Sequence, residues 1–140
     1  MDAERRREVN RLLAELTRCA QADASIAALA LVGSWARGAA TDESDLDVLI
    51  LGDRDELLAR QPWAELTATA ELVQRRRFGS VAERRYRLPS GLVLELGVAS
   101  RRWASVDPVD AGTRLVISDG MRVVVDPEGL LERLRRAVAA

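Results

Sequence analysis

The order of apolar and polar residues predicts alternating helical and extended segments. Residues 3–22 place apolar side chains three and four positions apart, which predicts an amphipathic helix. The runs at 26–32 and 46–51 are almost continuously apolar, as is typical of strands buried on both faces. Two extended runs within 81–99, joined by a Leu-Pro-Ser-Gly turn, predict a β-hairpin.

Shorter signals predict the remaining elements. One helix is expected before Pro62 and another after it, because proline disfavours helix in the residue before it. A last helix is expected after Asp126, which can cap it, with Pro127 at its first position. The expected elements not yet named are a helical turn at 35–39, helices at 54–60 and 63–75, a short helix at 113–117 and a strand at 121–125.

Composition narrows the class of protein and its chemistry. The 140 residues fit one domain, and the net charge of −1 gives no global attraction to nucleic acid or to an anionic membrane. No apolar run is long enough to span a bilayer and the N-terminus lacks the apolar core of a secretion signal, so we expect a cytoplasmic protein. Without histidine or lysine, and with Cys19 as the lone cysteine, the chain lacks the residues for a Ser-His pair, a Schiff base or a zinc cluster. Carboxylates must therefore do the acid, base or metal work.

Asp45 and Asp47 stand out among the acidic residues. A strand places residues i and i+2 on one face, about 7 Å apart, so both carboxylates point the same way. Acidic pairs with this spacing occur five times, and a solvated turn around Ser44 is an alternative reading of this one. However, this pair leads directly into a buried apolar run, and a Gly33-Ser34 turn that suits phosphate oxygens lies just upstream. The segment is therefore a candidate site for a magnesium nucleotide.

Glu95 is a third candidate ligand, because it interrupts an otherwise apolar strand in the second arm of the hairpin. An ionised carboxylate is costly to bury without a partner, so a metal ion or an arginine is expected beside it. The alternative is an edge-strand glutamate that faces water or pairs across the hairpin with Arg85 or Arg87.

The segment GSWARGAATDESDLDVLI resembles the Gly-Ser, spacer, Asp-x-Asp signature of the polymerase-beta-like nucleotidyltransferase superfamily, and Glu95 falls where that family carries its third carboxylate. The downstream segment, LELGVASRRWASVDPVDAGTRLVISDGMRVVVDPEGLLERL, is similar to the end of the catalytic domain in aminoglycoside (streptomycin-type) adenylyltransferases. The resemblance implies an α/β nucleotidyltransferase fold, in which helices pack on a mixed sheet of about five strands.

The resemblance also implies an activity, the metal-dependent transfer of an NMP, AMP from ATP, to a small-molecule hydroxyl such as that of an aminoglycoside-like compound, with release of pyrophosphate. Asp45, Asp47 and Glu95 would hold two Mg²⁺ ions, for which Mn²⁺ is an alternative, and Glu95 would also serve as base. The residues implied in nucleotide binding are Gly33, Ser34, Arg37 and Ser44.

Two departures from the family pattern bear on the acceptor. Trp35 replaces a residue that is often polar, so it is expected to pack on the sheet or to shape the nucleotide pocket. Antibiotic-modifying relatives carry a second, helical domain that helps to form the acceptor site, whereas residues 1–140 account only for the catalytic domain. A second subunit in a homodimer would then supply the rest of the acceptor site, or the natural acceptor would be another protein.

Two alternative functions follow: an antitoxin that AMPylates or binds a helical toxin, and a nucleotide-binding module without turnover. The arginine clusters, at 75–77, 84–87 and 101–102, are read as a solvated face rather than as a groove for an anionic acceptor. No nucleic-acid partner is expected.

Overall fold

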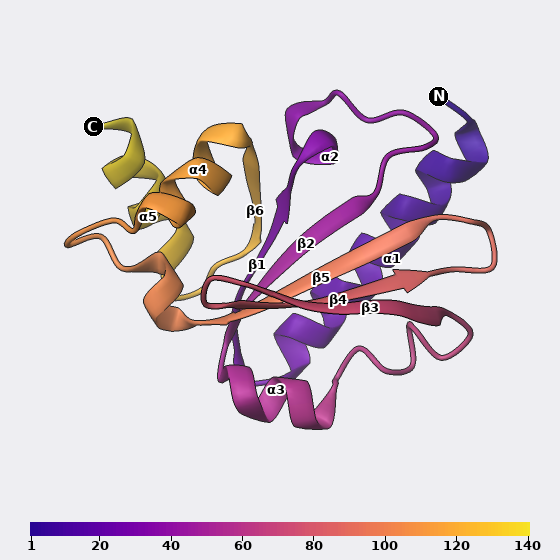
Figure 1. The fold of residues 1–140 in the computed structure, drawn as a ribbon, viewed down its shortest axis with the longest axis horizontal. Coiled ribbons are helices and arrows are strands. Elements are labelled where there is room, and N and C mark those ends of the chain that lie inside the picture. The colour runs from indigo at the N-terminus through magenta and orange to yellow at the C-terminus, as the bar shows by residue number, and fades with distance from the viewer.

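The fold is built on one six-stranded sheet with the strand order β3-β4-β5-β2-β1-β6 (Figure 1). The computed structural model describes residues 1–140. β2 and β5 are parallel at the centre, and all other neighbouring strands are antiparallel. The strands are β1 (Ile26–Val32), β2 (Leu46–Gly52), β3 (Glu71–Phe78), β4 (Val81–Arg87), β5 (Val93–Ser100) and β6 (Met121–Val125). The helices are α1 (Ala3–Ala22), α2 (Ser34–Arg37), α3 (Arg54–Arg60), α4 (Ala111–Asp119) and α5 (Leu130–Ala139), with a 3-10 turn, η1 (Arg101–Ala104).

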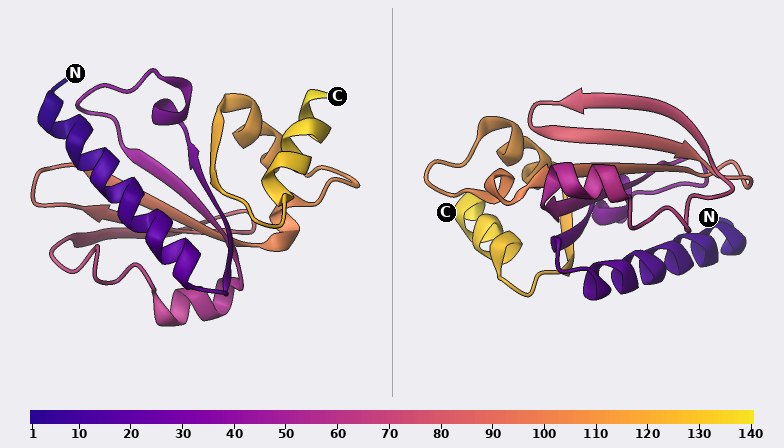
Figure 2. Two further views of the ribbon diagram at one scale, coloured as in Figure 1. Left: turned by 180° about the vertical axis from the view of Figure 1, so that it is seen from behind. Right: turned by 90° about the horizontal axis from the view of Figure 1, so that it is seen from below.

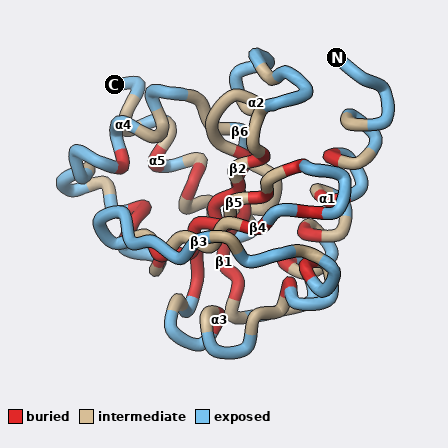
Figure 3. Tube along the Cα trace, turned by 45° about the vertical axis from the view of Figure 1, so that its right-hand side comes forward, coloured by how far each residue is buried: buried red, intermediate tan, exposed pale blue.

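Apolar layers form on both faces of the sheet, but they cover different parts of it. On one face, the buried stripe of α1 packs with Leu57 of α3 and with alternate residues of β1, β2 and β5 (Figure 2). On the other face, η1 and α5 bury only the apolar side chains of β1, β2 and β5, such as Leu49 and Leu51, near Trp103 and Leu131. β1 and β2 are consequently buried along almost their whole length (Figure 3), as the continuous apolar runs predict.

The expected helix at 63–75 is wrong. Only turns follow Pro62, and the chain then forms β3, which pairs antiparallel with β4 from Glu71 opposite Arg87 to Phe78 opposite Val81. β3 is exposed along almost all of its length, so it lacks the alternating apolar pattern that identifies a strand. Its glutamate, glutamine and arginines favour helix locally, but the ladder with β4 overrides that preference. The sheet therefore has one strand more than expected.

Two helix boundaries also differ from the expectation. The last helix begins at Leu130, so Pro127 lies in a turn before it and not at its first position. Asp126 nevertheless accepts hydrogen bonds from the backbone N–H groups of Leu131 and Glu132, at 3.2 and 3.0 Å, and in this way satisfies the start of the helix. α4 extends beyond the expected 113–117 because the side chain of Asp110 accepts from two N–H groups of its first turn. No helix of the protein combines the length and the apolar character needed to cross a membrane.

Candidate functional site

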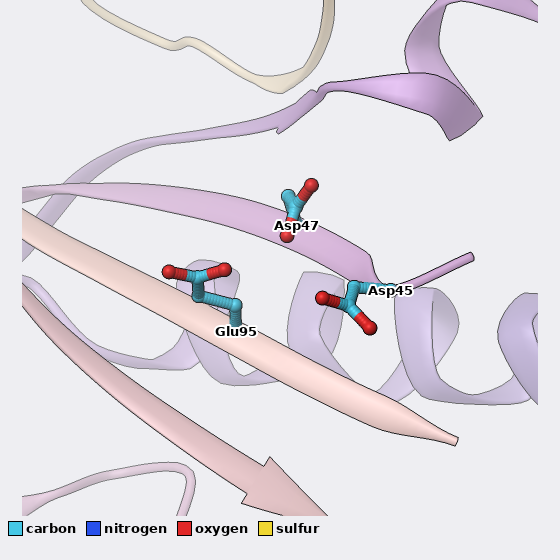
Figure 4. A group of neighbouring side chains, drawn as sticks. All are labelled: Asp45, Asp47 and Glu95. Carbon is cyan, nitrogen blue, oxygen red and sulfur yellow. The ribbon is translucent and has the colours of Figure 1, made fainter. Parts of the chain in front are cut away.

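The three candidate acids meet on the central parallel pair of strands. Asp47 of β2 lies opposite Glu95 of β5 in the ladder, so their side chains emerge side by side on the same face. Asp45 lies two residues before Asp47 and shares that face. One oxygen from each of the three carboxylates lies within 4.8 Å of the others (Figure 4). The structure therefore brings together the acids that the sequence places 48 residues apart.

Gly33 lies directly against Asp47. Its φ of +72° is in the left-handed region, and a Cβ at this position would lie 2.6 Å from Asp47 Oδ2. A larger residue would have to push the carboxylate aside. The turn between β1 and α2 is thus packed onto the acidic site, so the Gly-Ser turn and the Asp-x-Asp pair lie next to each other, as one nucleotide site needs.

β4 contributes two charged residues to the site: Arg85, the cross-strand partner that the sequence suggests for Glu95, and Glu83, which is not among the sequence candidates. Arg85 donates from Nη2 to Asp45 Oδ2 at 2.6 Å and from Nη1 to Glu95 Oε2 at 3.2 Å. Glu83 lies two residues before Arg85 on the same face and accepts from Arg76 Nε at 2.8 Å. The alternation of side chains along a strand could have indicated Glu83, because residues two apart, such as Glu83 and Arg85, point to the same face. Arg76 carried no such signal because β3 itself was not expected.

The electrostatics of the site reflect a surplus of negative charge. Burial, followed by the neighbouring Glu83 and Asp47, raises the pKa of Glu95 to about 8. Burial, with a further contribution from Asp45, raises the pKa of Asp47 to about 6. Burial would also raise the pKa of Glu83, but hydrogen bonds from Glu95 and Arg76 outweigh it and lower that pKa. Protons held on these carboxylates therefore offset part of the surplus negative charge of the site.

The donor set fits a divalent cation. Magnesium takes oxygen ligands at about 2.1 Å, so two oxygens bound to one ion are at most roughly 4.2 Å apart, and three carboxylate oxygens within 4.8 Å of one another can share an ion after a small movement. Asp47 Oδ1 is buried and has no hydrogen-bond partner in the protein, which is costly for a carboxylate unless a ligand completes it. Asp45, Asp47 and Glu95 are accordingly the residues that could hold the metal.

A pocket of about 270 Å³ opens beside the acids. Its polar end is formed by Gly33, Asp47 and Glu95, together with Arg76 and Glu83. The apolar part of its lining comes from β1, β2, β3, β4, η1 and α4 and includes Phe78, Val81, Trp103 and Val116. Charged and apolar surfaces therefore lie side by side, as in sites that hold a reactive group at one end and a ring at the other.

The remaining sequence candidates lie outside this pocket. Arg37 pairs with Asp119, whose carboxylate lies 2.8 Å from its Nη1 and whose carbonyl oxygen also accepts from it. Ser44 Oγ accepts from the N–H of Thr41 at 2.8 Å and closes the loop before β2. Ser34 begins α2 immediately after Gly33. The structure thus brings Gly33 to the acids, whereas Arg37 and Ser44 have partners of their own.

Trp35 packs against the core cluster beneath α2 and does not line the pocket. Of the two roles expected for it, the structure supports packing on the sheet. Its indole N–H is buried without a hydrogen-bond partner.

Comparison with known proteins identifies the family and the fold. Residues 13–96, more than half of the chain, match the family model of the nucleotidyltransferase domain. The structure is similar to that of Cid1 poly(U) polymerase with MgGTP bound, with a TM-score of 0.52 and 21% identity over 70% of this chain and 33% of that one. It is similar to a cytoplasmic RNA terminal U-transferase as well, with a TM-score of 0.52 and 21% identity over 84% of this chain and 34% of that one. The chain therefore spans about a third of each of these structures, and the likeness is one of fold. No curated protein matches it.

Proposed function

Because the chain belongs to the nucleotidyltransferase domain family, we propose that it transfers AMP from ATP to a hydroxyl group of a small molecule and releases pyrophosphate. Membership of the family confirms the resemblance to the polymerase-beta-like superfamily that the sequence motif indicates. The observation that carries the proposal is the convergence of Asp45, Asp47 and Glu95 directly beside Gly33.

The chemistry divides between the acids and the glycine turn. The acceptor oxygen forms a bond to the α-phosphorus of ATP, the bond from that phosphorus to the bridging oxygen breaks, and pyrophosphate leaves with the bridging oxygen. Glu95 takes the proton of the acceptor hydroxyl in its ionised form, which a bound cation would favour over the protonated form of the metal-free protein. Asp45, Asp47 and Glu95 would hold Mg²⁺ or Mn²⁺, and the ion would supply stabilisation of the negative charge that develops during the transfer.

Gly33 and Ser34 orient the β- and γ-phosphates through backbone N–H groups and a hydroxyl. Ser44 is a further hydroxyl contact in this proposal. Arg37 contributes a charge-assisted contact only after it exchanges Asp119 for phosphate, because its guanidinium is paired with that carboxylate.

The form of the pocket supports a small acceptor. A volume of about 270 Å³ next to the acids accommodates one ring, and the side chains of Phe78, Trp103 and Val116 offer it apolar contact. An RNA 3′ hydroxyl is the second candidate acceptor, because the similar structures are of a poly(U) polymerase and an RNA terminal U-transferase. The two candidates share the site and the chemistry and differ only in the acceptor.

A thermal-shift experiment with Asp47→Asn tests the proposal without knowledge of the acceptor. ATP should raise the melting temperature of the parent protein only when Mg²⁺ or Mn²⁺ is present, because a ligand of the native state stabilises it. Asp47→Asn should remove this shift without unfolding the protein, since the substitution relieves repulsion at a carboxylate that burial already disfavours. Asp55→Asn is the matched control, because Asp53 and Asp55 repeat the same spacing on an exposed helix start.

An equal Mg-ATP shift in Asp47→Asn and in the parent would show that the site is wrongly assigned. The acceptor is tested with ATP labelled on its α-phosphate and a panel of hydroxyl compounds and RNA oligonucleotides. Label transfer to a small molecule supports the leading proposal, and transfer to RNA supports the second. Nucleotide binding with no product on any acceptor would favour a binding module, and co-purification of a helical protein would favour the antitoxin function.

A further inference from the structure

Arg85 occupies a central place among the acids. It lies opposite Glu95 in the β4–β5 ladder, and its guanidinium bridges from that residue to Asp45 with contacts of 3.2 and 2.6 Å. About a third of the Arg85 side chain is exposed, so the two ion pairs are partly shielded from water. A single planar group thereby holds carboxylates from two strands together.

These two contacts engage oxygen atoms of residues that belong to the candidate metal site. A carboxylate oxygen that accepts a hydrogen bond from a guanidinium and one that coordinates a cation both require the same lone pairs, and the two positive charges repel each other. The guanidinium is therefore placed to compete with a divalent cation.

We infer that Arg85 is a positioning residue which keeps Asp45 and Glu95 together in the metal-free protein and yields them when a divalent cation binds. In this role Arg85 limits the affinity of the free protein for metal and prevents the acids from repelling one another. The inference rests on the proposed function only in taking the three acids as a metal site.

Two neighbouring arginines, one on β3 and one on β4, do not share this position. Arg76 makes its short contact with Glu83, and its distance to Glu95 is 3.5 Å. Arg87 follows Arg85 on the same face of β4 but pairs with Glu71 at the exposed edge, at 3.5 Å. Arg87 is thus a control with the same charge, the same strand and the same face, but outside the acidic site.

The test compares Arg85→Gln with Arg87→Gln by measuring Mn²⁺ binding without nucleotide, using the electron paramagnetic resonance signal of free Mn²⁺. Arg85→Gln should bind Mn²⁺ about tenfold more tightly than the parent, because a competing cation has been removed next to the ligands. Without metal, Arg85→Gln should melt below the parent, and Mn²⁺ should raise its melting temperature by more than it raises that of the parent. Arg87→Gln should match the parent in both measurements.

The direction of the affinity change separates this role from a merely structural one, since damage to the site would weaken metal binding. Mn²⁺ affinity in Arg85→Gln that equals or falls below that of a metal-binding parent overturns the inference and leaves the proposed function standing. Absence of Mn²⁺ binding in both proteins overturns the metal site itself, and the proposed function with it. Should Arg85→Gln fail to fold, Arg85→Lys provides the test. Lysine carries a single point charge and cannot bridge both carboxylates as the fork of arginine does. The Arg85→Lys protein should therefore also bind Mn²⁺ more tightly than the parent.

Discussion

The two faces of the β2–β5 pair have opposite properties. On the α1 side, Val48 and Leu96 and their neighbours in the same rows are at most 2% exposed and pack in the larger apolar cluster. On the opposite side, Asp47 and Glu95 stand in the same two strands among charged residues at the edge of a pocket. Because successive side chains of a strand alternate between faces, one pair of strands contributes to the core with one face and forms the site with the other. Stability and chemistry are therefore separable by substitution at adjacent positions.

The largest expected effect is on the core face. Leu96→Ala should lower the free energy of unfolding by about 3 kcal/mol, because it removes fully buried methyl groups and leaves a cavity at the centre of the sheet. Urea unfolding measures the loss. Leu115→Ala is the control, since Leu115 on α4 is 70% exposed and its truncation should cost less than about 0.5 kcal/mol. A cost for Leu96→Ala below that of the exposed control would contradict the assignment of the core.

Substitution of Gly33 in the turn before α2 should cost less stability than Leu96→Ala but should abolish the response of the site to Mg-ATP. Gly33 and Gly38 share a φ of +72°, but a Cβ meets Asp47 Oδ2 at Gly33 and nothing within 4 Å at Gly38. Alanine should cost about 1 kcal/mol at Gly38, whose ψ of 20° is left-handed helical, and more at Gly33, whose ψ of −151° lies in a region that is essentially restricted to glycine. Only Gly33→Ala should also displace the carboxylate and abolish the thermal shift caused by Mg-ATP. Loss of this response in Gly38→Ala as well would show that the turn acts through its backbone and not through contact with Asp47.

The sequence predicts the local parts of the site and not the pairings between distant strands. Asp45 and Asp47 are recognisable because a buried apolar run follows them, and Glu95 because it interrupts one. That Asp47 lies opposite Glu95 depends on the parallel register of β2 and β5, which no local pattern specifies. The sequence predicts either a metal ion or an arginine beside Glu95. The structure places Glu95 both with the other acids and beside Arg85.

The error at β3 has the same origin. This edge strand is specified by its ladder with β4, because its exposed arginines provide no apolar alternation. Arg76 reaches the acidic site only through that ladder. The charged surroundings of the acids could therefore be predicted only in part, from the parity of residues within β4.

A pH-dependent effect, smaller than that of Leu96→Ala, follows from the protons that the acidic face holds. The pKa of Glu95 is raised from 4.5 to about 8 and that of Asp47 from 3.8 to about 6, in both cases chiefly by burial. The folded state then binds more protons than the unfolded chain between these limits, so the stability of the metal-free protein should fall as the pH rises from about 4.5 to 8. We expect a loss on the order of 1–2 kcal/mol, measured by urea unfolding across this range.

Glu95→Gln sharpens the prediction, because glutamine resembles the protonated acid and cannot ionise. Its stability should be nearly independent of pH above about 7, where Asp47, with a pKa of about 6, has almost fully titrated, whereas the parent should continue to lose stability up to about pH 8. Glu83 and Asp23 cannot produce this slope: their pKa values are lowered from 4.5 and 3.8, so the stability they contribute is present above those values and is lost only as the pH falls below them. Equal slopes in the parent and in Glu95→Gln would place the proton elsewhere. Metal should abolish the slope of the parent, since the cation takes the place of the proton among the same oxygens.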